Sequence, residues 1–337
     1  MVAGAVSDFG VAILGCGRIG RLHAAILTSS IPGAHVATVF DPIPEAASEV
    51  ASASGCSSAT SVEAAIDAPG VDVVAICTPT NHHLANIESA CAAGKAIFCE
   101  KPIALDIAEV DRAVHIVEAT DTFFHVGLNR RFDPSHSAVA RTVAEGDVGD
   151  VHLVRVTSRD PAPPPLDYIR QSGGLFLDMT IHDFDMARFV SGSRIVEVFA
   201  KADVRVDPAI GEAGDIDTAI VTLQHENGAL TAIDNSRRAT YGMDQRVEVL
   251  GSLGSVASEN VRINTATLSD ASGTRAAVLQ HFFLERYYES YVEQWRAFVE
   301  ALSSGAAPPI SIHAGRAALR VGLAAQESLR TRTPIKV

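Results

Sequence analysis

Apolar residues follow two different patterns along the chain. Up to residue 128, segments that are apolar throughout, such as 9–14 and 71–77, alternate with stretches of helical period. Strands of this kind are typical of a parallel sheet that is buried on both faces. The same pattern predicts helices near 44–53, 61–67 and 106–119 and a closing strand at 122–128. We therefore expect an alternating α/β domain over residues 1–128.

The rest of the chain, residues 129–337, reads as strands broken by glycine or polar turns, which predicts a second domain built on a sheet. The strands are expected at Ile195–Val206, Asp217–Gln224, Ala229–Asn235 and Gln245–Leu250. One face of such a sheet would be a natural oligomerisation surface. Two helices should follow, one through Trp295 and Phe298 and one near 313–329. At helical spacing these aromatic rings are more typical of a core than of a cofactor contact.

Residues 159–168 contain too many prolines for a helix or a central strand, so we expect a stiff, extended loop. Such a loop borders a binding site or forms a structural arm, and the sequence leaves both open.

Composition narrows the class of protein. The 337 residues are 47% hydrophobic and 20% charged, as in a globular protein, and the net charge is −13. That charge argues against nucleic acid or an anionic membrane as the main partner. We expect no export signal, and the sequence contains no apolar run of about 18 residues. The five cysteines form no C-x-x-C pair and favour reduced thiols. We expect a cytoplasmic protein.

The first apolar strand runs into a glycine-rich turn that opens a helix. The turn reads Gly15, Cys16, Gly17, Arg18, Ile19 and Gly20. In this setting the first glycine makes the turn, the second lets the backbone meet a pyrophosphate, and the third lets helix and strand pack. The second strand ends about twenty residues on in Asp41, which can bind ribose hydroxyls and would repel a 2′-phosphate. With no basic residue close after Asp41, the sequence predicts NAD rather than NADP.

Two further strands end in polar residues at the carboxyl edge of the sheet, where such sheets bind ligands. Thr78 and Pro79 are expected to border the nicotinamide half of the cofactor. His82 is a further candidate there, although the pattern favours His82 and His83 as residues that start a helix. After the next strand, Lys101 could stabilise alkoxide character in a substrate, or could form only a surface ion pair with Glu100.

A helix from about residue 178 would place Asp178 and His182 on one face, where the carboxylate can hold and polarise the imidazole. The alternative is a buried, structural histidine beside ordinary surface carboxylates. His182, Asp183 and Asp185 could also ligate a metal, but no cluster with ligand spacing lies nearby, so we expect no metal.

With the glycine motif, Glu100-Lys101-Pro102 and the Asp178–His182 pair in view, the chain resembles the Gfo/Idh/MocA oxidoreductases nearly end to end. Within that family it is most similar to the bacterial inositol 2-dehydrogenases, through residues 129–134, 157–161, 173–188 and 235–241. The resemblance implies an α/β protein: an N-terminal Rossmann domain that binds the dinucleotide, then an α/β domain with a large, mostly antiparallel open sheet for substrate binding and oligomerisation.

The resemblance also implies roles for single residues. Lys101, Asp178 and His182 would form the catalytic set, with Glu100 placing Lys101 and the nicotinamide. The residues that it implies around the polyol are Asn129, Arg131, Asp160 and Tyr241, together with Asp178 and His182. Met243 stands where these enzymes often have an aromatic residue, which leaves the identity of the polyol open.

The expected reaction is NAD-dependent oxidation of a secondary ring hydroxyl of a cyclitol, foremost the axial hydroxyl of myo-inositol, by a homotetramer. Oxidation of scyllo-inositol, glucose or an anhydrosugar is the near alternative. A regulatory protein that binds NAD without turnover, or a glycoside hydrolase that uses NAD catalytically, would be a different class.

Overall fold

The computed structural model describes residues 8–337. The first seven residues, on which the expected absence of an export signal partly rests, lie outside the described residues. Packing divides the chain into two compact units. Unit 1 comprises residues up to Asn129 together with Ser290–Ala317, and unit 2 comprises Arg130–Glu289 with Ala318–Val337. Packing thus groups the chain differently from a single division after residue 128.

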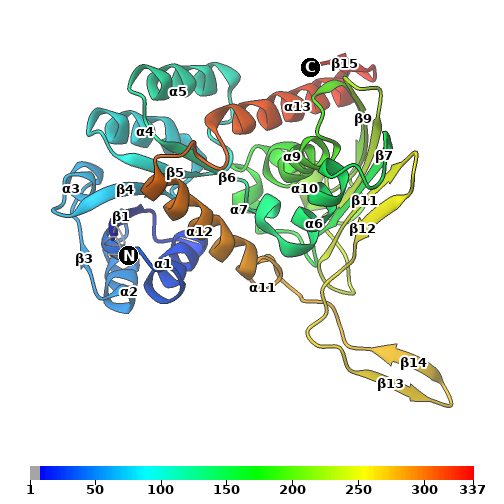
Figure 1. Ribbon diagram of the computed structural model, residues 1–337, viewed down its shortest axis with the longest axis horizontal. Coiled ribbons are helices and arrows are strands. Elements are labelled where there is room, and N and C mark those ends of the chain that lie inside the picture. Colours follow the sequence, from blue (N-terminus) through cyan, green and yellow to red (C-terminus); the bar gives the residue numbers. More distant parts are fainter. Residues whose placement is uncertain (1–7) are drawn as a thin grey trace. The chain divides into compact units, whose positions relative to one another are not determined.

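Unit 1 is built on a six-stranded parallel sheet with strand order β3-β2-β1-β4-β5-β6. The central strand β1 is fully buried from Val11 to Leu14, as its continuous apolar sequence predicts. The strand order reverses between β1 and β4, and the crevice at that switch point is where sheets of this topology bind dinucleotides. Figure 1 shows α1 on one side of this sheet and α4 and α5 on the other. The expected Rossmann architecture is confirmed.

The elements of unit 1 follow the predicted alternation. Their bounds are β1 Phe9–Leu14, α1 Arg18–Ser30, β2 Ala34–Phe40, α2 Pro44–Ser54, β3 Ser57–Ser58, α3 Val62–Ile66, β4 Val71–Ile76, η1 Thr80–His82, α4 His83–Ala92, β5 Ala96–Glu100, α5 Ile107–Ala119, β6 Phe124–Gly127 and η2 Asn129–Phe132, the last of which ends in unit 2. Asp106 caps α5 by accepting the backbone N–H groups of Ala108 and Glu109.

Helix α12, Tyr288–Ser304, returns from late in the sequence to pack into unit 1. Its Trp295 is fully buried and stacks on Phe98 of β5, with ring centroids 4.3 Å apart. Phe298 is also fully buried, so both rings are core residues as expected. These apolar contacts explain why this distant segment belongs to unit 1.

Unit 2 is built on a seven-stranded sheet with order β12-β11-β7-β10-β9-β8-β15. Only the β7–β10 pair is parallel within this sheet, which confirms the mostly antiparallel expectation. Strand β9 alternates between buried and exposed side chains along its length. Helices α6 and α9 cover one face (Figure 1), where Phe184 packs with Val154, Val221 and Val247.

The elements of unit 2 are α6 Pro134–Ala144, β7 Val151–Arg159, α7 Leu166–Ile169, α8 Gly174–Asp178, α9 Thr180–Ser191, β8 Ile195–Asp203, α10 Pro208–Glu212, β9 Thr218–His225, β10 Leu230–Ser236, β11 Asp244–Gly251, β12 Ser255–Ser258, β13 Thr267–Asp270, β14 Gly273–Ala276, α11 Phe283–Arg286, α13 Ile312–Thr331, whose first turns belong to unit 1, and β15 Ile335–Lys336. The β13–β14 hairpin projects from the sheet in Figure 1. The four predicted strands are confirmed as β8 to β11.

One local expectation for unit 2 needs correction. The strand predictions missed β7, an interior strand that lies between β11 and β10, although Val154, Val156 and Ser158 are buried at alternate positions along it. The helix predicted from about residue 178 is confirmed as α9, which begins at Thr180, and the short α8 ends at Asp178 just before it. The proline segment is an extended loop up to Pro165, as expected, and α7 follows it.

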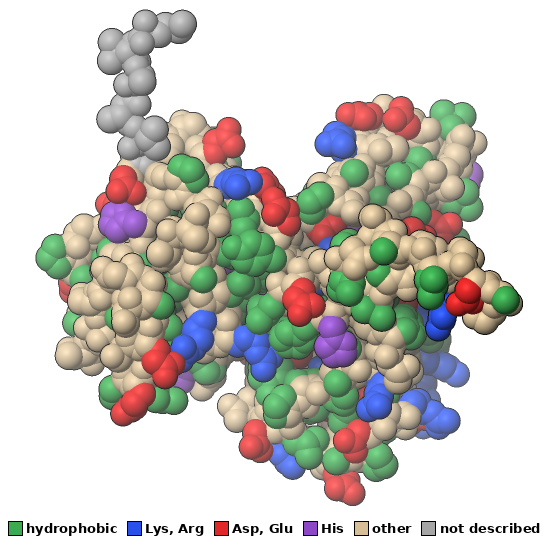
Figure 2. Space-filling model, turned by 90° about the horizontal axis from the view of Figure 1, so that it is seen from below, with side chains coloured by type: hydrophobic (Ala, Val, Ile, Leu, Met, Phe, Trp, Pro, Cys, Tyr) green, Lys and Arg blue, Asp and Glu red, His purple; other side chains and the backbone are tan. Residues whose placement is uncertain are grey.

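The surface carries both signs of charge. On the face shown in Figure 2, acidic and basic side chains are interspersed with small groups of apolar ones. Of the helices between residues 8 and 337, none is both long enough and apolar enough to cross a membrane.

Candidate active site

The three motif glycines occupy the turn between β1 and α1, and two of them are required by the protein itself. Gly15 has φ +98°, and a Cβ on Gly20 would lie 1.9 Å from the carbonyl oxygen of Gly15. A Cβ on Gly17, by contrast, would meet nothing within 4 Å. Gly17 therefore leaves space open at the N-terminus of α1, where Arg18 and Ile19 begin the helix. This space suits a pyrophosphate held by free N–H groups.

Asp41 follows β2 and fastens the glycine turn. Its Oδ2 accepts the backbone N–H of Cys16 at 2.7 Å, and its Oδ1 accepts that of Ile43 at 2.9 Å. Each carboxylate oxygen can accept a further hydrogen bond, so Asp41 can hold the turn and still bind ribose hydroxyls. Burial, with the charge of Asp41, raises the pKa of the Cys16 thiol to about 11.

The turn after β4 is tied to the turn after β5 by His83, which sequence reasoning assigned only to a helix start. His83 does begin α4, but its ring is buried. Its Nδ1 lies 2.8 Å from the carbonyl oxygen of Pro102, and its Nε2 lies 2.8 Å from that of Thr78. Burial lowers the pKa of His83, and its neutral ring donates to one carbonyl at a time. His82 and Pro79 are exposed, and Asn86 donates to the Thr78 hydroxyl at 3.1 Å.

Glu100 is the last residue of β5, and it is buried. Its Oε2 accepts the backbone N–H of Lys101 at 3.2 Å, which fixes the start of the turn. The peptide bond from Lys101 to Pro102 is cis.

In unit 2, Asp178 and His182 lie on either side of the short break between α8 and α9. The polar neighbours of the Asp178 carboxylate include a tyrosine and an arginine. Tyr168 donates its hydroxyl to Oδ1 at 2.8 Å, and the guanidinium of Arg237 lies 3.5 Å from Oδ2. The guanidinium thus places a positive charge beside the carboxylate of Asp178.

Helix α9, which carries His182, is fixed by a buried ion pair beside that histidine. Asp183 is fully buried, and it accepts from Arg130 at 2.6 Å and from the amide of Asn235 at 2.8 Å. Asn235 in turn accepts the hydroxyl of Thr180 at 2.7 Å. Burial raises the pKa of Asp183, while the bonds from Arg130 and Asn235 oppose that rise. Thr180 and Asp183 are thus both bonded to Asn235 of the sheet, and Asp183 is also bonded to Arg130.

Arg131, expected at the polyol, pairs with Asp185 of the same helix. Two guanidinium nitrogens contact the two carboxylate oxygens, at 2.8 and 2.5 Å, and the guanidinium lies over the ring of Phe189. Together with the Arg130–Asp183 pair, this contact gives both carboxylates once considered as metal ligands an arginine partner. Among residues 8–337, no group of three or more potential ligand side chains could hold a metal ion.

Asp160 follows β7 and is partly exposed. Its backbone is held on both sides, because its N–H donates to Ser236 and its carbonyl accepts from Ala239. Burial of the carboxyl raises its pKa to about 6, while the charges of Arg237 and Arg130 lower it. Asp160 therefore changes charge close to neutral pH, a property suited to a group that binds hydroxyls.

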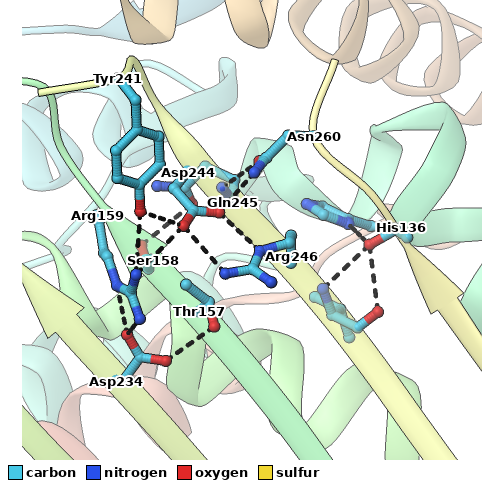
Figure 3. Close-up of polar contacts among 12 residues, drawn as sticks. His136, Thr157, Ser158, Arg159, Asp234, Tyr241, Asp244, Gln245, Arg246 and Asn260 are labelled. Atoms are coloured by element: carbon cyan, nitrogen blue, oxygen red, sulfur yellow. Dashed lines mark hydrogen bonds and ion pairs between the residues drawn. The ribbon is translucent and has the colours of Figure 1, made fainter. Parts of the chain in front are cut away.

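Tyr241 lies in a polar cluster at the ends of β7 and β11 (Figure 3). It donates to Asp244 at 2.7 Å and accepts from Arg159 at 3.0 Å. Asp244 is buried and also accepts from Arg246 and Asn260. The hydroxyl of Tyr241 is thus held by protein partners, although half of the side chain remains exposed.

The other two residues expected at the pocket are buried. Asn129, which ends unit 1, donates its amide to the hydroxyl of Ser290 at 2.9 Å. Met243 is also buried, in unit 2. Lys101 belongs to unit 1, whereas Asp178, His182, Arg131, Asp160 and Tyr241 belong to unit 2.

Sequence reasoning missed the groups that hold these side chains in place. Arg237 is the clearest case, because it is buried and lies 3.5 Å from both Asp178 and Asp215. Asp215 also accepts the backbone N–H of Leu175 at the start of α8. The paired basic residues at 237–238 after a strand were the only signal, and nothing in them indicates burial.

Comparisons with known proteins agree with this geometry. A family model described as an oxidoreductase family with an NAD-binding Rossmann fold matches residues 9–128, and one described as a GFO/IDH/MocA C-terminal domain matches residues 136–257. Myo-inositol 2-dehydrogenase of Thermotoga maritima is 44% identical over 97% of this chain and 98% of its own length. Inositol 2-dehydrogenase of Rhizobium meliloti is 46% identical over 96% and 98%, respectively.

A solved structure gives the same fold. Scyllo-inositol dehydrogenase from Lactobacillus casei, crystallised with NAD(H) and scyllo-inositol, superposes with a TM-score of 0.92 at 28% identity. The superposition covers 98% of this chain and 99% of that one.

Proposed function

The chain belongs to the Gfo/Idh/MocA oxidoreductase family, and from this we propose that it oxidises the axial hydroxyl of myo-inositol to the 2-ketone, with NAD as the hydride acceptor. One observation carries the proposal: relatives named for this activity are 44 and 46% identical across almost the whole of both chains. The likeness therefore includes the polyol end of the protein as well as the dinucleotide end.

We assign the proton chemistry to His182, which takes the hydroxyl proton while Asp178 stabilises the resulting imidazolium. Lys101 donates a hydrogen bond to the same oxygen and stabilises its alkoxide character. Bound NAD supplies the acceptor for the hydride that leaves the ring carbon. One proton and one hydride leave a CH–OH group, so the product is a ketone. Tyr168 and Arg237 support this assignment, because both contact Asp178.

We assign NAD to the crevice of unit 1, with Gly15, Gly17 and Gly20 at the pyrophosphate and Asp41 at the adenosine ribose. The open space at Gly17 supports this placement, since a group must approach the backbone there. Thr78, Pro79, His82 and Glu100 are assigned to the nicotinamide half. To the polyol we assign Asn129, which ends unit 1, together with Arg131, Asp160 and Tyr241 of unit 2.

The test is NADH formation by the purified protein with NAD and, separately, NADP. The substrates are myo-inositol, scyllo-inositol, glucose and an anhydrosugar. Strong turnover of myo-inositol with NAD is expected. Turnover of another polyol, without turnover of myo-inositol, would mean that the substrate assigned to the pocket around Asp160 and Met243 is wrong. Tight NAD binding with no turnover of any polyol would favour a regulatory protein, and cleavage of a glycoside without net NADH would favour a hydrolase.

We further propose that the protein acts in inositol catabolism in the cytoplasm, as a homotetramer. The outer face of the seven-stranded sheet supports self-association, because Ile220, Leu230 and Leu250 are exposed on it. Light scattering after size-exclusion chromatography measures the assembly. A monomer at micromolar concentration would contradict this part of the proposal.

A further inference from the structure

The carboxylate of Glu100 lies in a socket that unit 1 builds from three separate segments. His23 of α1 lies with its Nε2 2.9 Å from Oε1 of Glu100. Trp295 of α12 donates its indole N–H to Nδ1 of the same histidine, also at 2.9 Å. His23 and Trp295 are fully buried, so water does not compete for either contact.

The indole N–H of Trp295 determines which ring nitrogen of His23 carries the proton. An indole nitrogen only donates, so Nδ1 of His23 must be the acceptor and carries no proton. The single ring proton of the neutral histidine then resides on Nε2. It is donated to Glu100, whose second oxygen accepts the backbone N–H of Lys101. Both hydrogen bonds therefore have the same direction: Trp295 donates to His23, and His23 donates to Glu100.

The residue opposite Glu100 on the neighbouring strand β6 is a glycine, and a side chain there would collide with the Glu100 carboxylate. Glu100 pairs with Gly127 in the register of β5 and β6. A Cβ on Gly127 would lie 2.9 Å from Cδ and Oε1 of Glu100. Phe98, two residues before Glu100 on β5, packs against the edge of the His23 ring and stacks on Trp295. The carboxylate is therefore confined sterically as well as by hydrogen bonds.

We propose that Trp295 and His23 are positioning residues for the dehydrogenase reaction, which fix Glu100 and, through the Lys101 N–H, the turn that presents Lys101. This inference rests on the proposed function, because the turn matters to turnover only if Lys101 contacts the reacting oxygen. Neither residue touches the substrate. The effect should appear in turnover more than in the affinity for NAD.

The main test is Trp295→Phe, which keeps an aromatic ring for stacking on Phe98 and removes the N–H together with one ring of the indole. Turnover should fall roughly tenfold to a hundredfold, because small misplacements of catalytic groups cost that much. The KM for NAD should stay within about twofold.

Phe298→Leu is the matched control. Phe298 also packs on Phe98, with centroids 5.8 Å apart, but it offers no hydrogen bond. It should lower thermal stability and leave kcat unchanged. Equal losses of turnover in the two variants would show that Trp295 only fills the core and would overturn the proposal.

His23→Gln and His23→Leu separate the relay from the packing of the ring. Glutamine can accept from Trp295 and donate to Glu100, so it should recover most of the turnover that leucine loses. If glutamine is as inactive as leucine although both fold, the relay is wrong. If neither folds, Trp295→Phe still decides.

A readout without turnover separates this inference from the proposed function. The chain has one tryptophan, so its indole N–H gives a single ¹H–¹⁵N signal. That signal should be protected from solvent exchange in the wild type and should lose its hydrogen-bonded shift in His23→Leu. An unchanged signal would overturn the relay. Absence of activity on every polyol, with the expected shift, would overturn only the proposed function.

Discussion

The two units hold their candidate functional groups by opposite means. In unit 1 the glycine turn is shaped by the main chain: Gly20 lies against the carbonyl of Gly15, and Asp41 accepts the N–H of Cys16. In unit 2 side chains hold side chains across long stretches of sequence, as Arg130 holds Asp183 over 53 residues. The dinucleotide end thus depends on local backbone geometry, whereas the polyol end depends on buried charge pairs.

This difference has consequences for substitutions. A backbone-shaped site fails when a side chain is added where none fits, and its neighbours are little affected. A site held by buried ion pairs fails when one partner is removed, because the other charge is left without compensation. The two ends should therefore respond to different kinds of substitution, and each should leave the other intact.

The largest effect is expected for His182→Ala in unit 2. Loss of the general base should lower kcat with myo-inositol about 100-fold to 10,000-fold. The Kd for NAD, a property of unit 1, should change less than about twofold. Steady-state kinetics and calorimetric titration with NAD give the two numbers.

His152→Ala is the control for this variant, because His152 is exposed on β7 and has no assigned role. It should behave as the wild type. If His182→Ala lowered turnover and NAD affinity equally, the dinucleotide end and the polyol end would not be independent. His182 would then not be the general base.

The next largest effect is on stability, from Asp183→Asn. The substitution keeps the shape of the side chain but leaves Arg130 buried without its counter-charge. The free energy of unfolding should fall by about 3–5 kcal/mol, as when one partner of a buried ion pair is removed. Denaturant titration measures it. Arg130→Met added to Asp183→Asn should recover part of the loss, because the uncompensated charge is gone.

A loss below about 1 kcal/mol in the single variant would contradict the view that charge pairs hold unit 2. If the double variant is no more stable than Asp183→Asn alone, the loss of Arg130 has a cost of its own. Arg130 would then be stabilised by other partners, Ser158 or Tyr287 among them.

The same contrast explains how much the sequence alone could predict. The glycine turn, the position of Asp41 after β2 and the strands of unit 1 were predicted correctly, because each is encoded within a few neighbouring residues or by a continuous apolar pattern. The strands β8 to β11 were predicted for the same reason, since their periods are local.

The partners of Arg131, Asp178 and Glu100 could not be predicted. Asp185, Arg237 and His23 lie 54, 59 and 77 residues away along the chain, and only the folded units bring them together. Burial of charge is equally invisible in the sequence, because Arg237 reads there as an ordinary surface arginine.

A smaller effect should separate two glycines of one motif. Gly20→Ala places a Cβ 1.9 Å from the carbonyl oxygen of Gly15, so the turn must shift, and stability should fall by about 1–3 kcal/mol. Gly17→Ala meets no protein atom, so stability should change by less than about 0.5 kcal/mol. Its affinity for NAD should nevertheless fall roughly tenfold, about 1.4 kcal/mol, if the pyrophosphate occupies that space.

Thermal unfolding and NAD titration of both variants give the comparison. Loss of stability in Gly17→Ala would show that the space is filled by the protein. Unchanged NAD affinity in that variant would place the pyrophosphate elsewhere.

The smallest effect concerns pH, and it tests whether a charge in unit 2 serves binding or stability. The pKa of Asp160, about 6, lies above its usual 3.8, so the folded protein binds this proton more tightly than the unfolded chain does. Its contribution to stability is therefore present below the unfolded value and is lost as the pH rises through about 6. If the carboxylate form binds the polyol, KM should instead rise roughly tenfold per pH unit below about 6. Asp160→Asn should abolish both trends, and a KM in the wild type that stays flat from pH 5 to 8 would remove Asp160 from the polyol site.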